Sequence, residues 1–219
     1  MKTNNQFRKT FRVGVAGPVG SGKTALVASL VTHLKNSCPV GVVTNDIFTA
    51  EDAEFLKKLS ILPDDLIIAV KTGCCPHTAI REDISANLEA AELIESRLPA
   101  ESIVLIESGG DNLTATFSYG LIDKQIFVLD IAGGDKLARK GGPGITQSDL
   151  LVINKIDLAE MVGANRVQME EEALVARNRQ PTISTSVRFE TNTALVAQWV
   201  LEQRELFLES ASAQAHPDI

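Results

Sequence analysis

The segment Gly17-Pro-Val-Gly-Ser-Gly-Lys-Thr24 constrains the fold most, because it follows the apolar run 11–16 and precedes a helical pattern. A glycine-rich turn lets backbone N–H groups point at phosphate oxygens where a helix begins. Lys23 would add a charge for the β- and γ-phosphates, and Thr24 a hydroxyl for Mg²⁺. The alternative, a tight turn with an exposed lysine, is disfavoured by this context. The sequence therefore predicts a nucleotide-binding P-loop that comprises Gly17, Pro18, Val19, Gly20, Ser21, Gly22, Lys23, Thr24 and Ala25.

A second motif, Asn154-Lys-Ile-Asp157, ends another apolar run, 150–153. A carboxylate at this position can accept hydrogen bonds from N1–H and the exocyclic amine of guanine, whereas adenine offers no such pair of donors. Leaving a buried carboxylate unpaired is costly, so ATP should be rejected. A solvent-exposed Asn-Lys turn is the alternative, but the P-loop upstream disfavours it. We therefore predict GTP as the ligand, with contacts from Asn154, Lys155, Asp157, Thr185 and Ser186.

Short β-branched runs alternate with helical patterns along the 219 residues, of which 44% are hydrophobic. A chain of this size can bury a full core without disulfides. The expected strands are 11–16, 39–44, 66–70, 102–106, 126–131, 149–153 and 182–185, and the expected helices lie near 22–36, 51–60, 78–97, 161–178 and 191–208. This alternation predicts a single-domain α/β P-loop NTPase, with a mostly parallel sheet flanked by helices on both faces. We place the domain at 11–208, between flexible segments 1–10 and 209–219.

Charge and hydropathy exclude several function classes. The net charge is −7, and no Lys/Arg cluster with interleaved aromatic residues offsets it, so nucleic acid is not an expected partner. No apolar run is long enough to span a bilayer, and the first ten residues do not resemble a signal peptide. Three cysteines in such a chain do not suggest a disulfide framework. We therefore expect a cytoplasmic protein that does not bind membranes.

Acidic residues follow two of the expected strands. Asp46 and Glu51 come after the strand 39–44, and Glu107 comes directly after the strand 102–106. Parallel sheets bind ligands at the carboxyl ends of their strands, and Mg²⁺ prefers oxygen ligands. We predict Mg²⁺ ligation by Thr24, Asp46, Glu51 and Glu107, and catalytic roles for Lys23, Asp46 and Gly110, the last through an N–H that senses the γ-phosphate. For Glu51 an exposed acid in the first helical turn, favoured by the helix dipole, is an equal alternative.

A possible transition-metal site precedes the expected helix 78–97. Cys75 and His77 flank a proline that restricts the loop. Two ligands make half a site, and a symmetric dimer would place two Cys and two His around one ion, a set suited to Ni²⁺ or Zn²⁺. A buried thiol beside a histidine that caps a helix is the alternative, and on this segment alone it is the better interpretation.

Six segments together resemble a known family: 17–24, 44–52, 75–83, 107–112, 139–146 and 154–157. They are similar to the motif series of the UreG family of urease accessory proteins, nickel-insertion GTPases of the dimer-activated branch of P-loop proteins. The resemblance covers roughly residues 11–200. It implies GTP binding with Mg²⁺, a homodimer around one Ni²⁺ held by Cys75 and His77 of each protomer, and delivery of nickel to urease. The implied partners are the urease apoprotein, the other urease accessory proteins and a nickel metallochaperone.

The chain departs from the family pattern Glu-Thr-Gly-Gly-Cys-Pro-His at two positions, Lys71 and Cys74. In the family, that glutamate is associated with coupling the nucleotide and Mg²⁺ to the metal loop, and Lys71 reverses its charge. Two alternatives remain open. One is a GTPase for another nickel enzyme such as hydrogenase, which typically carries extra His or Cys residues near the N-terminus; residues 1–10 contain neither. The other is a coupling-defective nucleotide-binding paralogue.

Overall fold

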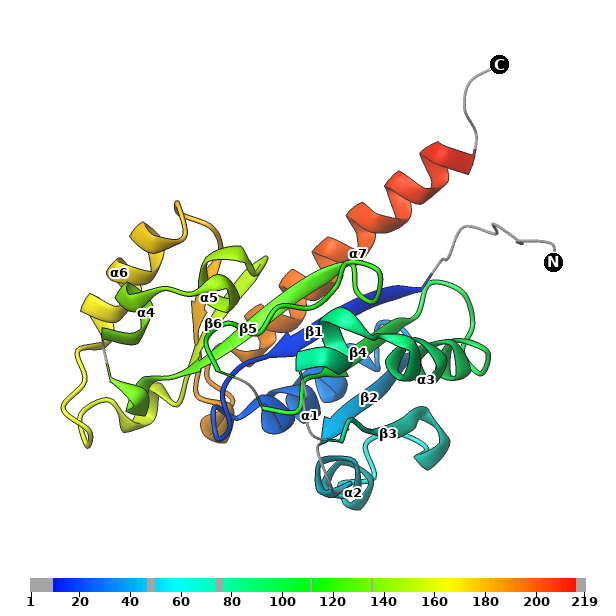
Figure 1. The fold of residues 1–219 in the computed structure, drawn as a ribbon, viewed down its shortest axis with the longest axis horizontal. Coiled ribbons are helices and arrows are strands. Elements are labelled where there is room, and N and C mark those ends of the chain that lie inside the picture. Colours follow the sequence, from blue (N-terminus) through cyan, green and yellow to red (C-terminus); the bar gives the residue numbers. More distant parts are fainter. Residues whose placement is uncertain (1–9, 47–49, 74–76, 111, 135, 216–219) are drawn as a thin grey trace.

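The computed structural model describes residues 10–46, 50–73, 77–110, 112–134 and 136–215. Its centre is a seven-stranded sheet in the order β3-β2-β4-β1-β5-β6-β7, in which each neighbouring pair is parallel (Figure 1). The strands are β1 Phe11–Ala16, β2 Val40–Asp46, β3 Ile67–Lys71, β4 Ile103–Glu107, β5 Lys124–Asp130, β6 Leu150–Asn154 and β7 Thr182–Ser184. The predicted fold class is confirmed.

Parallel strands need long crossover connections, which usually contain a helix. Helices lie in most of these connections, whereas the described residues between β4 and β5 form only turns and loops. The helices are α1 Lys23–Leu34, α2 Glu51–Lys58, α3 Ser85–Glu95, α4 Lys136–Lys140, α5 Pro143–Gln147, α6 Arg166–Ala176 and α7 Thr193–Ala215. The short helices α4 and α5 were not predicted. The last helix runs beyond the expected end at residue 208, and in Figure 1 its end projects past the strands. No helix in the described ranges is long and apolar enough to cross a membrane.

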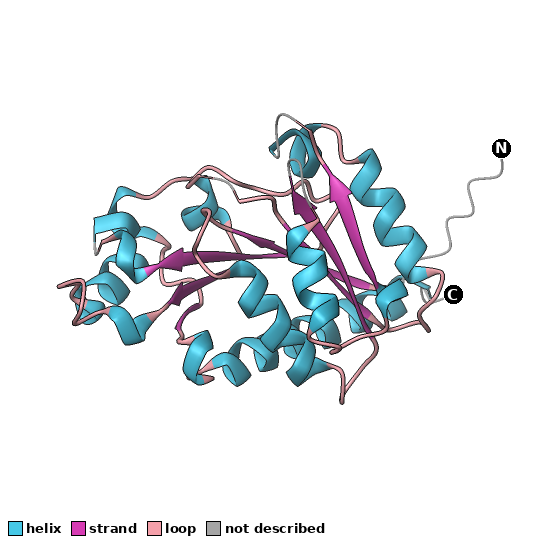
Figure 2. Cartoon of the chain, turned by 90° about the horizontal axis from the view of Figure 1, so that it is seen from below, coloured by secondary structure: helices cyan, strands magenta, loops and turns pink. Residues whose placement is uncertain are grey.

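Two hydrophobic clusters, one on each face, hold the helices against the sheet. Strand side chains alternate between faces, and apolar residues on both sides are typical of a parallel sheet. One cluster joins the strands to α1, α2 and α7, and the other joins them to α3, α4, α5 and α6. Figure 2 shows the strands between these helical layers. Both faces of the sheet are thereby covered, while the carboxyl ends of the strands remain available for loops that bind ligands.

The prediction of one continuous helix over 78–97 was wrong, because the structure divides this segment into two helical pieces. A π-helical turn, Thr78–Glu82, is followed by a break, and α3 begins only at Ser85. The Asp83 carboxylate accepts hydrogen bonds from the backbone N–H and the hydroxyl of Ser85, with its Oδ1 2.7 Å from the hydroxyl. Such local bonds compete with the helical pattern, so the chain restarts at a new helix.

The expected helix 161–178 also begins later than predicted, at Arg166. Asn165 caps it: its side-chain oxygen accepts a hydrogen bond from the backbone N–H of Gln168 at 3.1 Å. Asparagine is one of the preferred residues at this position, because it satisfies an N–H that has no partner within the helix. The preceding residues instead form turns.

Candidate nucleotide-binding site

The P-loop connects β1 to α1 at the carboxyl end of the sheet, and its glycines meet specific requirements. Gly20 and Gly22 have φ values of 78° and 92°, in the left-handed region that favours glycine. A Cβ atom on Gly22 would lie 2.5 Å from Nδ2 of Asn154. The two nucleotide motifs are thus packed so closely that a side chain at this position has no room.

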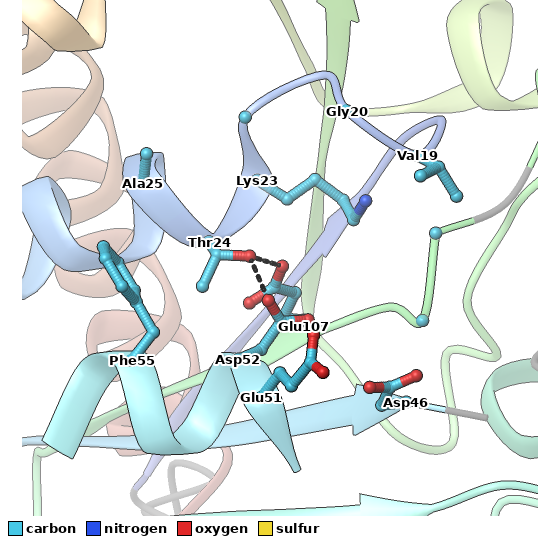
Figure 3. A pocket seen from close by; sticks show the side chains of 13 residues that line it. Val19, Gly20, Lys23, Thr24, Ala25, Asp46, Glu51, Asp52, Phe55 and Glu107 are labelled. Carbon is cyan, nitrogen blue, oxygen red and sulfur yellow. Dashed lines mark hydrogen bonds between the residues drawn. The ribbon is translucent and has the colours of Figure 1, made fainter. Parts of the chain in front are cut away.

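A cavity of about 660 Å³ opens beside the P-loop (Figure 3). It collects residues from the carboxyl ends of β2 and β4, from α2 and from the loop itself, in agreement with the expected position of a ligand in a parallel sheet. The lining residues are Val19, Gly20, Gly22, Lys23, Thr24, Ala25, Asp46, Glu51, Asp52, Phe55, Glu107, Gly109 and Gly110. All the residues predicted for catalysis and for Mg²⁺ therefore meet at one site.

Two carboxylates approach the Thr24 hydroxyl. Its Oγ1 lies 2.7 Å from Oε1 of Glu107 and 2.9 Å from Oδ1 of Asp52, as the dashed lines in Figure 3 show. A hydroxyl has a single proton to donate, so it can satisfy only one of these acceptors as a donor. The second contact requires either a proton on a carboxyl group or a cation. Glu51 of α2 was predicted as a Mg²⁺ ligand, but the α2 side chain that contacts Thr24 is that of its neighbour Asp52.

Glu107 is fully buried, and the pKa of its carboxyl group is raised to about 8, chiefly by burial. The charges of Asp52 and Asp46 contribute to this rise, whereas the Thr24 hydrogen bond and the Lys23 charge partly offset it. Its Oε2 has no hydrogen-bond partner among the described residues. Buried acids surrounded by other acids favour a bound cation, and hydroxyl and carboxylate oxygens suit Mg²⁺, which usually combines one or two carboxylates with phosphate oxygens. Thr24, Asp52 and Glu107 therefore fit this ion.

The remaining predicted residues surround this group. The Lys23 ammonium lies 3.2 Å from the carbonyl oxygen of Pro18 and extends along the loop toward Val19 (Figure 3). Asp46 and Glu51 both line the cavity. Gly110 has a φ of 83°, and a Cβ there would lie 2.7 Å from Cγ2 of Val19. Its backbone therefore approaches the P-loop closely, as a sensor of the terminal phosphate would.

A second cavity, of about 460 Å³, lies on the other side of the P-loop and shares Gly22 and Ala25 with the first. Its other lining residues are Asn154, Lys155, Asp157, Leu158, Val187 and Arg188. The predicted guanine-binding acid, Asp157, thus faces a cavity of its own beside the phosphate site. Val187 and Arg188 belong to a short 3₁₀ helix, Val187–Phe189. They were missed, because no pattern in the sequence connects them to the Asn-Lys-x-Asp motif.

The side chains of Asn154 and Lys155 brace the P-loop. Asn154 Nδ2 donates to the carbonyl oxygen of Ser21 at 3.0 Å. Lys155 Nζ lies 2.6 Å from the carbonyl oxygen of Gly20 and 2.6 Å from Oδ2 of Asp130. Asp130 ends β5 and was not predicted as a site residue, although a polar residue at the end of an apolar strand is a usable signal. These contacts fix the positions of the base-binding cavity and the phosphate-binding cavity relative to each other.

Thr185 and Ser186, predicted as GTP contacts, support the base-binding residues and are not among those that line the cavity. The Thr185 hydroxyl donates to Oδ1 of Asn154 at 3.2 Å, and the Ser186 hydroxyl donates to Oδ1 of Asp157. Similarly, Gly17, Pro18 and Ser21 belong to the loop backbone and do not line either cavity. Their part is to shape the loop that presents its N–H groups.

Of the two predicted nickel ligands, the structure describes only His77. Cys75 falls outside the described residues, and so does Cys74, where the chain departs from the family pattern. His77 is half-buried and precedes the π-helical turn. Lys71 is the exposed last residue of β3, in register with Asp46 of β2, which lines the phosphate cavity. Within the described part of the chain, no group of three or more His, Cys, Asp or Glu residues is arranged to hold a metal ion.

Comparison with known proteins agrees with this geometry. Residues 11–184 match the family described as CobW/HypB/UreG, nucleotide-binding domain. The urease accessory protein UreG of Streptomyces coelicolor is 55% identical over 196 residues, which cover 90% of this chain and 87% of that protein. UreG of Mycobacterium tuberculosis is 56% identical over 192 residues, covering 88% of this chain and 86% of its own.

Solved structures support the fold. HypB from Helicobacter pylori in complex with nickel has a TM-score of 0.76 at 22% identity, and the match covers 91% of this chain and 89% of HypB. The hydrogenase maturation factor HypB from Archaeoglobus fulgidus has a TM-score of 0.68 at 23% identity, covering 90% of each chain. At these identities the likeness concerns the fold alone.

We predict that Asp157 confers guanine selectivity, because its two carboxylate oxygens match two donors on guanine. Asp157→Ala should weaken GTP binding by about 1–3 kcal/mol and leave weak ATP binding nearly unchanged. Calorimetric titration with both nucleotides measures this, with the exposed Glu160→Ala as a control. Equal affinity of the unmodified protein for GTP and ATP would contradict the assignment.

We also predict that Glu107 destabilises the nucleotide-free, Mg²⁺-free protein as pH rises. Between the ordinary pKa of 4.5 and the raised pKa of about 8, the folded state keeps a proton that the unfolded state has released. Folding therefore loses stability through this window, and the loss is complete above it. Glu107→Gln should melt at a higher temperature than the parent near pH 8, with the smallest difference near pH 4.5. Identical pH profiles for parent and variant would exclude this effect, and the exposed Glu54→Gln serves as a control.

Proposed function

This chain belongs to the UreG group of the CobW/HypB/UreG family of nucleotide-binding domains, and we propose that it is a Mg²⁺-dependent GTPase that couples GTP binding and hydrolysis to nickel delivery during urease maturation. One observation carries the GTPase part. The cavity that contains Asp157 and the cavity that contains Lys23 share Gly22 and Ala25, so a single GTP molecule would extend from one to the other. The name of the curated relatives, urease accessory protein, suggests the client.

The binding step follows from the braced P-loop. Its backbone N–H groups and Lys23 would surround the β- and γ-phosphates. Asn154 and Lys155 hold the loop through the carbonyl oxygens of Ser21 and Gly20, so binding requires little rearrangement of this segment. Such preorganisation lowers the entropic cost of binding. Thr24, Asp52 and Glu107 would hold Mg²⁺, which neutralises phosphate charge when bound.

In the hydrolytic step, we assign Asp46 to positioning the attacking water or the Mg²⁺ shell, and the Gly110 N–H to a γ-phosphate oxygen. Both residues line the phosphate cavity, on the side opposite the base-binding residues. Lys23 would stabilise charge that develops on the bridging and terminal oxygens. Phosphoryl transfer depends mainly on such positioning and electrostatic stabilisation, and each of these groups acts in that way.

Nickel is the cargo in this proposal. Cys75 and His77 of two protomers would share one ion in a homodimer, since one chain offers too few close ligands. A nickel metallochaperone would load the dimer, and transfer to the urease apoprotein would occur in a cytoplasmic complex with the other urease accessory proteins. GTP turnover measured with Ni²⁺ and these partners, together with activation of apo-urease, tests the whole scheme. GTP binding without turnover would favour the binding paralogue.

Lys23→Ala is expected to abolish GTP hydrolysis, because it removes the only charge the P-loop supplies to the phosphates. Asp46→Ala should slow turnover more than it weakens GDP binding, since its assigned partner is at the γ-phosphate end. Single-turnover kinetics combined with GDP titration separates the two effects. Unchanged turnover in the Asp46 variant would remove this residue from the catalytic site.

One tightly bound Ni²⁺ per dimer is expected in the presence of a non-hydrolysable GTP analogue. Cys75→Ala or His77→Ala should abolish both this ion and metal-dependent dimerisation, while nucleotide affinity stays nearly unchanged. Light scattering and metal analysis of the same samples measure stoichiometry and size together. A tightly bound Ni²⁺ at these residues in every monomer would refute the shared site.

A further inference from the structure

A buried pair of amide side chains lies between β2 and α3. Asn45 and Asn87 are both 0% exposed. Nδ2 of each donates to Oδ1 of the other, and both distances are 2.8 Å. The two side chains therefore form a closed ring of two hydrogen bonds, in which each amide still has one N–H to donate.

The two remaining N–H groups connect the pair to different parts of the molecule. Nδ2 of Asn45 donates to the carbonyl oxygen of Glu107 at 2.9 Å, and Nδ2 of Asn87 donates to the carbonyl oxygen of Ala79 at 2.9 Å. All four amide N–H groups thus have acceptors. The result is a continuous path of hydrogen bonds from the end of β4 to the π-helical turn Thr78–Glu82.

Both ends of this path are functional in the proposal above. Glu107 contacts Thr24 at the phosphate cavity, and Asn45 directly precedes Asp46 of the same cavity. At the other end, Ala79 lies two residues after His77. The path joins main-chain groups at both ends, so a shift of the β4 end relative to the turn would break at least one buried hydrogen bond, which is costly.

Other contacts also hold the π-helical turn, so the turn can form without the amide pair, even if its position then changes. Ile80 is fully buried, and its carbonyl oxygen accepts from the Ser118 N–H at 2.8 Å. The Asp83 N–H closes the turn onto the carbonyl oxygen of Thr78, also at 2.8 Å. Removal of the amide pair would leave these contacts in place. Turns of the π type are rare and frequently lie at functional sites.

We propose that Asn45 and Asn87 are positioning residues that hold the turn after His77 in a fixed place relative to the nucleotide-binding edge of the sheet. Nucleotide-dependent movement of the β4 end would pass through the pair to the turn. This inference rests on the proposed nickel role of His77 only where nickel is the readout. The position of the turn itself is a separate quantity that can be measured without nickel.

Asn87→Leu in the full-length protein tests the proposal, because leucine has a similar size but can make none of these hydrogen bonds. Hydrogen exchange of the amides of residues 78–83 should accelerate by about tenfold or more, as expected for the loss of a buried hydrogen bond. Ni²⁺ affinity should fall by about tenfold, while affinity for a non-hydrolysable GTP analogue changes by less than about threefold. Asn87→Ala keeps the test open if the leucine variant does not fold.

Two further variants separate positioning from general stability. The double variant Asn45→Leu with Asn87→Leu replaces both partners by apolar groups, which can restore stability, yet it should retain the fast exchange of the turn. Arg177→Met is the matched control, because it removes a buried side chain that donates to the carbonyl oxygens of Ser148 and Pro181, near β6 and β7. It should lower the melting temperature without accelerating exchange at the turn.

The outcomes distinguish this inference from the proposed function. Equal acceleration at the turn in Asn87→Leu and Arg177→Met, or none in either Asn87 variant, would overturn the positioning role. If the His77→Ala variant binds Ni²⁺ as tightly as the parent protein does, the proposed nickel site fails. Hydrogen exchange at the turn alone then decides the role of the Asn45–Asn87 pair. Fast exchange confined to the amide-pair variants, together with weakened Ni²⁺ binding both in these variants and in His77→Ala, would support the positioning role and the proposed nickel site.

Discussion

The contacts between the end of β6 and the P-loop are the constraint on which the rest of the site depends. Asn154 and Lys155 donate to the backbone oxygens of Ser21 and Gly20, which lie more than a hundred residues earlier in the chain. A flexible glycine-rich loop would otherwise lose conformational entropy on each binding event. Because the hydrogen bonds from Asn154 and Lys155 already order the loop during folding, less entropy is lost on binding. The same bonds fix the distance between the base-binding and phosphate-binding cavities.

In the phosphate-binding cavity, acidic side chains that repel one another lie close together. Two carboxylates, Asp52 and Glu107, contact one hydroxyl, a third, Asp46, lines the same cavity, and Glu107 is fully buried. Such an arrangement opposes the stability of the protein without a cation, and a cation with phosphate relieves it. Ligand binding and local stability are therefore linked at this edge. The buried Asn45–Asn87 pair extends the same edge, through neutral hydrogen bonds, to the turn after His77.

Particular residues show which parts of the site could be predicted from sequence patterns and which could not. The P-loop and the Asn-Lys-x-Asp motif each lie at the end of an expected strand, because an apolar run precedes each motif and parallel strands gather their carboxyl ends at one edge. Glu51 was named where Asp52 makes the contact, because neighbouring acids in the first turn of α2 differ only in direction around the helix. The predicted helix 78–97 contained a break, because a local bond from Ser85 to Asp83 outweighed the apolar periodicity.

The sequence by itself determined the fold class, the nucleotide-binding motifs and the family, because these depend on local periodicity and on short contiguous segments. Only the tertiary structure decided which side chains meet: Asp130 with Lys155, Asp52 with Thr24, and Asn45 with Asn87. Each of these pairs joins residues that are far apart in the chain, and no periodic pattern encodes their distance. Their proximity comes from the order of the strands in the sheet and from the burial that this order imposes, which also sets the raised pKa of Glu107.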